Sequence, residues 1–239
     1  MADMTEFRFY AELNDFLPLS RRGRDFEHAV SQHQTLKHVV ESFGVPHTEV
    51  GLSLVNSEAA QMDCRLGPND RVSVLPAFRS LRDPRSGEPP RFIADAHLGR
   101  LARYLRFAGF DTLWRNAWSD AELVAMAARD NRIVLTRDRD LLMHKALSAG
   151  CYVRDHEAMA QLADIARRYA LDLSSTGAGR CLECNALPQS VSKGEVAAEL
   201  LPGTRAAFEE FWRCPGCLRV YWRGSHWRRM KLAISRLSA

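Results

Sequence analysis

Two Cys-x-x-Cys pairs, Cys181/Cys184 and Cys214/Cys217, limit the folding of the last part of the chain more than any other feature. Twenty-nine residues separate the pairs, and two thiolate pairs on tight turns at this spacing can close a tetrahedral Zn²⁺ site. Four thiolates leave no open coordination position, so we predict a structural zinc ion. Such an ion lets a short, loop-rich segment fold without a large core. A redox function of the pairs is the alternative interpretation.

The rest of the composition is typical of a soluble globular protein. The chain has 239 residues, enough for one large domain or two ordinary ones. It contains no apolar run near the roughly 18 residues that a membrane span needs. The N-terminus lacks a basic region followed by an apolar stretch, so we expect a cytoplasmic protein without a membrane association. The two unpaired cysteines, Cys64 and Cys151, are predicted to be buried apolar residues.

Charge is distributed unevenly along the chain. Residues 1–90 hold 10 Lys and Arg against 13 Asp and Glu, whereas residues 91–239 hold 23 against 16. No acid follows Glu210, although seven basic residues do. A basic C-terminal part suits a polyanion such as RNA, and the alternative is a solvated surface.

The first part of the chain, residues 1–78, has the pattern of a small α+β domain. FRFYAEL is strand-like, and a second, polar strand is expected near Phe26. HQTLKHVVESFGVP has apolar residues at helical spacing and then glycine and proline as stop signals. VGLSLVN and DRVSVLPAF are strand-like, and RSLRDPRSGEPP (residues 79–90) is predicted to be a linker. The order strand, strand, helix, strand, strand predicts a β-grasp domain.

On the stretches GVPHTEVGLSLVN and LGPNDRVSVLPAF, this domain resembles the ubiquitin-like sulfur carriers. Those carriers end in a free Gly-Gly whose carboxylate is activated. Here the matching residues 77–80 are AFRS and lie inside the chain. We therefore expect a module that contacts protein or RNA, and no sulfur transfer.

The second part alternates strand-like and helix-like segments. Strands are expected at residues 91–95, 110–114, 132–136 and 151–154, and helices at residues 98–109, 120–130, 139–150 and 156–171. Such alternation predicts a parallel sheet flanked by helices, here over residues 91–175. A zinc ribbon with a basic aromatic tail is expected over residues 176–239.

Four acids fall where the strands of this sheet are predicted to end. Asp95 ends RFIAD, Asp138 and Asp140 follow RIVLT, and Asp120 begins a helix beside the loop after FDTLW. Ligands of open α/β sheets bind at the carboxyl ends of strands, so we expect these side chains at one edge. Gathered carboxylates repel one another unless a divalent cation lies among them, and Mg²⁺ and Mn²⁺ prefer oxygen ligands. Glu122 is a substitute or partner for Asp120.

Each acid also has a structural interpretation. Ser119 or Asp120 can cap the helix that begins there, and Asp138 or Asp140 can cap the next one. Asp95, directly after an apolar strand, is the hardest to explain in this way.

FIADAHLGRLARYLRFAGFDTLW, SDAEL and IVLTRDRDLL together resemble the mut-seven C-terminal RNase family, over roughly residues 91–230. The resemblance implies a PIN-like nuclease fold with a terminal zinc ribbon and a ubiquitin-like domain in front. It implies the acidic set Asp95, Asp120, Asp138 and Asp140. From the stretch VYWRGSHW, it also implies that Arg223, Ser225 and His226 contact substrate.

Basic and aromatic residues supply candidate RNA contacts. Arg137 and Arg139 lie beside the acids, and His144 and Lys145 on the following segment are weaker candidates. The tail interleaves aromatic and basic residues, which suits single-stranded RNA because aromatics stack on bases and arginines pair with phosphates. The alternative is that the aromatics pack the ribbon and the arginines are solvated. The residues concerned are Trp212, Tyr221, Trp222, Trp227, Arg219, Arg223, Arg228 and Arg229.

The resulting hypothesis is a metal-dependent ribonuclease. Asp95, Asp138 and Asp140 would hold Mg²⁺ or Mn²⁺, and Asp120 would ligate the ion or orient a water molecule. A catalytically silent adaptor is the alternative, with the ribbon holding RNA and the ubiquitin-like domain holding a protein. A toxin-like nuclease is the third hypothesis, disfavoured by the additional ribbon and N-terminal domain.

Overall fold

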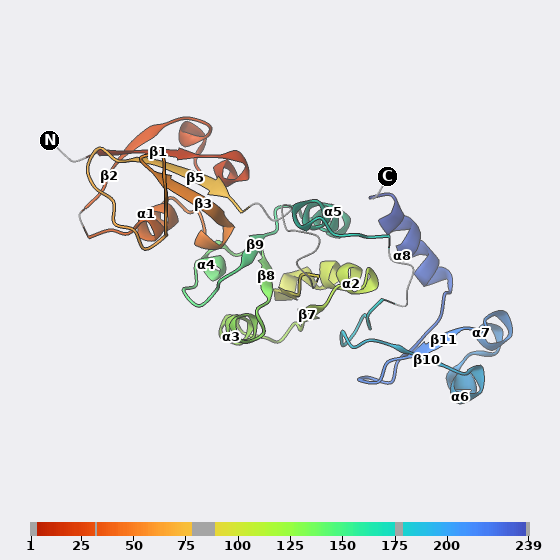
Figure 1. Cartoon of the computed structure of the whole chain (residues 1–239). Helices are drawn as coiled ribbons and strands as arrows, with labels where there is room; N and C mark the ends of the chain where they lie inside the picture. Colours follow the sequence, from red (N-terminus) through yellow and green to blue (C-terminus); the bar gives the residue numbers. More distant parts are fainter. Residues whose placement is uncertain (1–3, 32, 78–88, 175–178, 238–239) are drawn as a thin grey trace. The chain divides into compact units, whose positions relative to one another are not determined.

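A computed structural model describes residues 4–31, 33–77, 89–174 and 179–237 (Figure 1). The chain divides into two compact units, each built from two segments. One unit comprises Met1–Arg82 and Ser119–Tyr152, and the other comprises Asp83–Trp118 and Val153–Ala239. The expected linker at residues 79–90 falls mostly outside the described residues, as does the expected boundary at residues 175/176.

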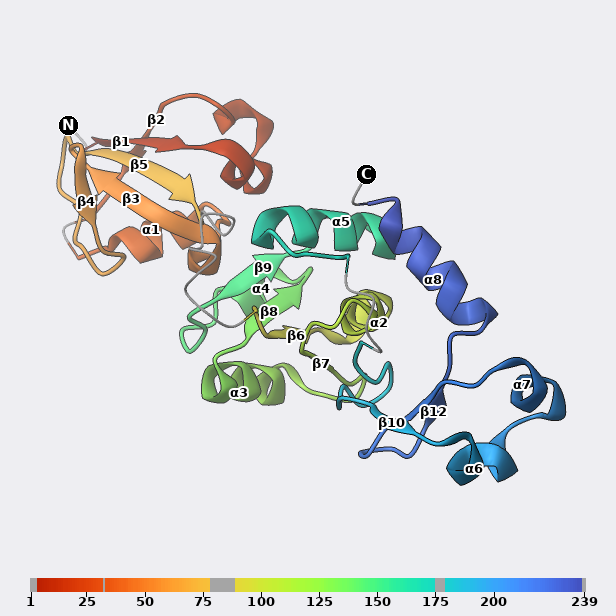
Figure 2. The same ribbon diagram turned by 45° about the vertical axis from the view of Figure 1, so that its right-hand side comes forward.

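The first segment of the first unit is a β-grasp domain, as the sequence predicts. Its five-stranded sheet has the order β2-β1-β5-β3-β4, with β1 parallel to β5 and the other neighbours antiparallel. Figure 2 shows helix α1 (Leu36–Ser42) beneath this sheet. The strands are β1 (Met4–Phe9), β2 (Phe26–Ala29), β3 (Val50–Val55), β4 (Glu58–Ala60) and β5 (Arg71–Pro76).

The alternation of apolar residues fixes which face of the sheet is buried. In β1 every second side chain is buried, including Phe7 and Phe9. Thr35 caps α1 by accepting the His38 N–H, and Leu36, Val39 and Val40 of the helix pack into the same core.

Two details of this domain differ from the expectation. The strand predicted over FRFYAEL ends at Phe9, and a 3₁₀ helix, η1 (Ala11–Phe16), follows it. Ala11 has a positive φ of 46°, and the Asn14 side chain donates to the Phe9 carbonyl, so the chain turns immediately after the strand. The short strand β4 was not predicted from the sequence.

The second segment of this unit contains α3 (Asp120–Asp130), β8 (Ile133–Thr136), α4 (Arg139–Leu142) and β9 (Gly150–Tyr152). Strands β8 and β9 pair in parallel, and all four residues of β8 are buried. An apolar strand followed by a helix and a parallel strand is the pattern expected for this region.

Helix α4 is much shorter than the predicted helix over residues 139–150. The Thr48 hydroxyl of the β-grasp segment donates to the Leu142 carbonyl at 3.1 Å. The Ala146 N–H, which would bond to that carbonyl in a continuing helix, donates instead to His144 Nδ1 at 3.2 Å. The Leu142 carbonyl is thus bonded by a tertiary contact, and the Ala146 N–H that a further helical turn would direct to it bonds locally instead.

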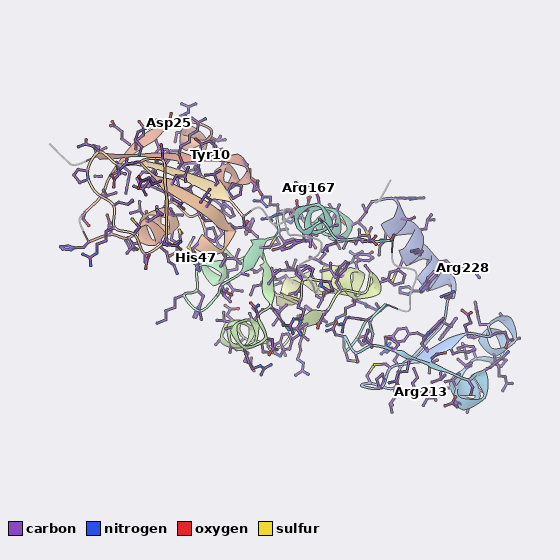
Figure 3. The ribbon with its side chains drawn as sticks, viewed as in Figure 1. Tyr10, Asp25, His47, Arg167, Arg213 and Arg228 are labelled. Carbon is purple, nitrogen blue, oxygen red and sulfur yellow. The ribbon has the colours of Figure 1, made fainter. Side chains whose placement is uncertain are left out.

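The two segments of the first unit are joined by further contacts from 3₁₀ helix η3 (His47–Glu49). The buried Glu49 carboxylate accepts the Tyr152 N–H, and the His47 ring bonds to the Leu147 carbonyl. His47 is labelled in Figure 3, where it lies beside α4. The β-grasp segment therefore packs on the α4 and β9 region and is not a free module within this unit.

The second unit begins with β6 (Phe92–Ala94), 3₁₀ helix η5 (Ala96–Leu98), α2 (Gly99–Phe107) and β7 (Thr112–Trp114). Strands β6 and β7 pair in parallel, and α5 (Ala158–Tyr169) packs on α2. One face of α2 is apolar and buried through Leu101, Ala102 and Leu105, and Leu98 of η5 is buried just before it.

The remainder of this unit forms the cysteine-containing part. Its antiparallel sheet has the order β10-β11-β12, and its last element is the basic helix α8, which the sequence analysis did not predict. The elements are β10 (Gln189–Val191), α6 (Lys193–Val196), η6 (Ala197–Glu199), α7 (Pro202–Ala207), β11 (Phe211–Arg213), β12 (Val220–Tyr221) and α8 (Ser225–Ser235).

These elements confirm the expected fold class: parallel α/β strands with flanking helices, a β-grasp domain and a terminal cysteine cluster. Among the described residues, no helix is long and apolar enough to cross a membrane.

Candidate functional site

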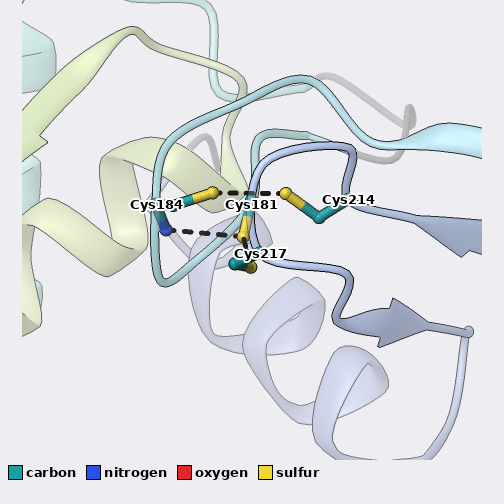
Figure 4. A group of neighbouring side chains, drawn as sticks. All are labelled: Cys181, Cys184, Cys214 and Cys217. Carbon is teal, nitrogen blue, oxygen red and sulfur yellow. Dashed lines mark hydrogen bonds between the residues drawn. The ribbon is translucent and has the colours of Figure 1, made fainter.

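The four predicted zinc ligands converge. The sulfur atoms of Cys181, Cys184, Cys214 and Cys217 all lie within 4.8 Å of one another (Figure 4). Cys184 and Cys214 sulfurs are 3.2 Å apart, and those of Cys181 and Cys217 are 3.5 Å apart. Zn–S bonds of about 2.3 Å in a tetrahedron place sulfurs about 3.8 Å apart, so the cluster has the size of a Zn²⁺ site.

The two cysteine loops repeat the same backbone geometry. In each loop the residue after the second cysteine, Asn185 or Leu218, has a positive φ and donates its N–H to the carbonyl of the first cysteine at 2.9 Å. This turn points both thiols of a pair to the same side. The equivalence of the loops supports a four-thiolate metal site over a redox pair.

Tyr221 makes one thiol of the cluster different from the others. Its hydroxyl lies 3.0 Å from Cys181 Sγ and accepts the Leu182 N–H. Burial raises the pKa of Cys181, but bonds from the Tyr221 hydroxyl and from backbone N–H groups outweigh burial and lower this pKa to about 6. The thiolate that a metal needs is thus favoured at Cys181. Tyr221 thus packs against the cysteine cluster, which agrees with the structural interpretation of this aromatic residue.

Arg106 and Asn185 attach the cysteine loops to the parallel strands of the same unit. The buried Arg106 guanidinium donates to the carbonyls of Leu182, Glu183 and Thr112 at 2.8–3.0 Å. The Asn185 side chain accepts the Thr112 N–H and donates to the Asp111 carboxylate. Sequence analysis missed Arg106, because one arginine in an amphipathic helix carries no motif.

Asp95 lies in the second unit, immediately after β6. It is half-buried, and its Oδ1 accepts the Ala96 N–H at 2.5 Å. It is therefore the N-cap of η5, between the last residue of β6 and the first residue of this 3₁₀ helix.

The other predicted acids lie in the first unit. Asp138 and Asp140 follow β8 and are exposed. Asp138 caps α4, since its Oδ1 accepts the N–H groups of Asp140 and Leu141 at 2.8 and 3.3 Å. The capping interpretation of Asp138 is thus correct, although it does not exclude a second role for the other oxygen.

The cap of α3 is Ser119, and not Asp120. Ser119 and Glu122 form a reciprocal capping box, which occupies the Glu122 carboxylate. Asp120 is exposed in the first turn. Within the described residues, Asp120, Asp138 and Asp140 form no ion pair, and their oxygens do not form a group within 4.8 Å.

The two arginines beside Asp138 have different surroundings. Arg137 is half-buried, whereas the Arg139 guanidinium lies 5.1 Å from the Phe16 ring centre and 5.6 Å from that of Tyr152. It also donates to the Phe16 carbonyl at 3.5 Å. Arg139 therefore contributes to the packing of the two segments of the first unit. His144 and Lys145 are exposed.

Several predicted RNA contacts line one cavity of about 280 Å³ in the second unit. Arg223, Ser225 and His226 contribute from the start of α8, together with aromatic rings from β11, α8 and α2. Arg228 does not line the cavity and is exposed on α8 (Figure 3). Sequence analysis missed Arg103 and Phe107, which reach the same cavity from α2.

Of the two unpaired cysteines, Cys151 is buried as predicted. Cys64 is only half-buried and bonds to the Arg65 carbonyl, so the prediction of burial is wrong for this residue.

Comparison with known proteins gave two family matches. A model described as the Mut7-C RNAse domain matches residues 90–234, and one described as Mut7-C ubiquitin matches residues 2–82. Among solved structures, the chain is similar to SAMP1 from Haloferax volcanii at 18% identity, covering 36% of this chain and 99% of that chain. The TM-score of that likeness is 0.25, and nothing on function follows from it. No curated protein matches the chain.

Proposed function

Since the chain belongs to the Mut7-C RNAse domain family, we propose that it is a ribonuclease that hydrolyses RNA phosphodiester bonds with a bound divalent cation. One observation carries the catalytic part of the proposal. Asp138 and Asp140 follow the buried strand β8 directly, and no basic side chain of the described chain pairs with them. Uncompensated carboxylates at the carboxyl end of a parallel strand are the setting in which α/β proteins bind ligands.

The donors fit Mg²⁺ or Mn²⁺, because both ions prefer carboxylate oxygen. We assign Asp95, Asp138 and Asp140 to hold the ion, which when bound supplies a Lewis acid for the phosphate and an acidified water molecule. Asp138 uses Oδ1 for the α4 cap, which fixes the orientation of its carboxylate. Asp120, which makes no ion pair within the described chain, is assigned to ligate the ion or to orient water.

The basic residues are assigned to the RNA. Arg137 would pair with a phosphate beside the acids. Arg139 would do so only in competition with its contacts to Phe16 and Tyr152. The RNA strand would also be held by residues that lie far from the acids in the sequence: Arg223, Ser225, His226 and Arg228.

The cysteine cluster is assigned to structural zinc, and the domains to residues 1–78, 91–175 and 176–239. In this assignment the zinc ribbon and its tail bind RNA, and the ubiquitin-like domain is the surface for a protein partner.

Cleavage of an end-labelled RNA tests the proposal. Zinc-loaded protein is incubated with Mg²⁺, with Mn²⁺ or without either ion, and Asp95→Asn and Asp138→Asn are compared with wild type. Asparagine keeps the capping bonds and removes only the charge. Asp172→Asn is the matched control, because Asp172 also accepts an N–H two residues ahead, from Ser174.

We expect cleavage that needs the added ion, is lost in both test variants and is kept in Asp172→Asn. Wild-type cleavage by Asp95→Asn would contradict the assignment. RNA binding without cleavage at any ion concentration would instead support the silent adaptor.

A further inference from the structure

The cavity of the second unit has aromatic walls. It lies between helix α2 and the residues around β12 and the start of α8. The Phe107 and Trp227 rings are 6.0 Å apart between centres, with their planes tilted by 51°. Trp212 from β11 and Trp222 after β12 also line it. Aromatic rings from α2, β11, α8 and the residue after β12 therefore form the walls of the cavity.

Arginines surround these rings. The Arg223 guanidinium lies 5.2 Å from the Trp212 ring centre and 5.6 Å from that of Trp227, and it pairs with Glu210 at 3.3 Å. Arg103 and Arg219 share a single acid, Glu183, at 3.4 and 3.9 Å. Four arginines and one glutamate line the cavity, and Glu210 and Asp111 pair with two of these arginines, so the arginines outnumber the acids around the cavity by one.

The geometry points to a site for one unstacked nucleobase and its adjoining phosphate from single-stranded RNA. We infer that the base takes the place of the Arg223 guanidinium against Trp212 or Trp227, and that the displaced Arg223 pairs with the phosphate together with Arg219. Aromatic platforms with arginines are the means by which proteins hold single strands without reading a duplex. This inference rests on the proposed function only in naming RNA as the ligand.

The size of the cavity supports a single nucleotide. At about 280 Å³ it falls just below the roughly 300–1,000 Å³ of ordinary small-molecule sites. A duplex keeps its bases stacked inside, so it could offer only phosphates to this cavity. An aromatic side chain of a peptide would also stack, but a positive cavity disfavours peptides without acidic residues.

Binding in the absence of cleavage tests the inference. The Asp138→Asn protein is loaded with zinc, and its tryptophan fluorescence and the anisotropy of a labelled ligand are followed. The ligands are a short single-stranded RNA, its blunt duplex and an abasic ribose-phosphate chain of equal length. We expect the single strand to quench tryptophan and to bind about ten-fold more tightly than the abasic chain.

Substitutions locate the effect in the cavity. Trp227→Leu and Trp212→Leu should each weaken single-strand binding about ten-fold while leaving the abasic chain unaffected. Arg223→Gln should weaken both ligands. The matched controls are Trp118→Leu, a tryptophan that does not line the cavity, and Arg167→Gln, an exposed arginine of α5 labelled in Figure 3.

If the protein without a cavity substitution bound the single strand and the abasic chain with equal affinity, the inference would be overturned. This outcome does not depend on whether any cavity variant folds. Tighter binding of an acidic aromatic peptide than of RNA would overturn it in favour of a protein ligand. Base-dependent binding by a protein that never cleaves would support this site and contradict only the ribonuclease proposal.

Discussion

Arg106 is a charged side chain held inside the second unit, with 2% of its surface exposed. Its donors satisfy backbone carbonyls in two segments distant in sequence, the β7 strand and the first cysteine loop. Burial lowers the pKa of Arg106, because the charged form loses hydration, yet the carbonyl acceptors keep the group fully bonded. The Arg106 guanidinium therefore links strand β7 to the cysteine-containing part of the unit.

Arg106→Met should lower the free energy of unfolding by about 3 kcal/mol or more, because it leaves buried carbonyls without donors. Urea unfolding of the zinc-loaded protein measures this difference. Arg100→Met, an exposed position on the same helix, is the control and should change little. A loss below about 1 kcal/mol would show that water replaces the guanidinium.

Substitution can separate the capping of α4 by Asp138 from the cation-binding role that we propose for this residue. Asp138→Ala removes both the α4 cap and the charge, and Asp138→Asn removes only the charge. We expect thermal denaturation to show a loss of about 1 kcal/mol for alanine and little for asparagine, while both abolish cleavage. If the asparagine variant cleaved RNA and only the destabilised alanine variant lost cleavage, the role of Asp138 would be restricted to capping α4.

The positions of individual residues could be predicted where they belong to short motifs, and could not where they are isolated in the sequence. The spacing of the four cysteines predicted that their side chains lie together, as they do. The motif LTRDRD after an apolar strand predicted that Asp138 and Asp140 follow that strand, as they do. Arg106, Arg103 and Phe107 act through neighbours far away in sequence, so local pattern gave no signal for them. The orientation of Arg139 toward Phe16 was equally hidden.

Among the elements, the two cysteine loops depend most directly on a bound ion. Without one, four thiols lie within 4.8 Å of one another, on loops that have little core of their own. A metal that binds only the folded loops contributes its binding free energy to folding.

Removal of zinc by a chelator should therefore unfold the loops locally. Hydrogen exchange should show loss of amide protection over residues 181–221, with the β-grasp segment unchanged. Cys181→Ser should give the same result without chelator, and Cys64→Ser should not. Full protection after verified loss of zinc would mean that Arg106 and Asn185 hold the loops unaided.

Helix α4 shows where periodicity fails as a predictor of elements. The apolar spacing of residues 139–150 is helical, yet the Leu142 carbonyl accepts from Thr48 and the Ala146 N–H donates to His144. Elements with self-contained patterns, such as α2 and α5, formed as expected. The basic helix α8 was missed because its buried residues, Met230 and Ile234, are few.

For the whole molecule, the compact units do not follow the order of the sequence. The family models divide the chain near residues 82–90, whereas the first unit combines Met1–Arg82 with Ser119–Tyr152. Thr48, Glu49 and Phe16 supply the contacts between these segments. The sequence pattern predicts that the β-grasp segment is a separate module, because no local sequence motif indicates its contacts with the second segment.

A chain that lacks residues 1–82 should therefore be less stable, and not merely shorter. It exposes the apolar surface that Phe16 covers at Tyr152 and leaves the Tyr152 N–H without its carboxylate. We expect a lower Tm and stronger binding of a hydrophobic dye than for the full chain. An unchanged Tm would show that the ubiquitin-like domain is an independent module.

The most direct test of the account is Mn²⁺ binding to zinc-loaded protein, followed by electron paramagnetic resonance. We expect a Mn²⁺ site in the wild type whose affinity falls about ten-fold or more in both Asp95→Asn and Asp138→Asn, but not in Asp172→Asn. Wild-type Mn²⁺ affinity in either of the first two variants would contradict the proposal that the substituted residue is a ligand of the ion.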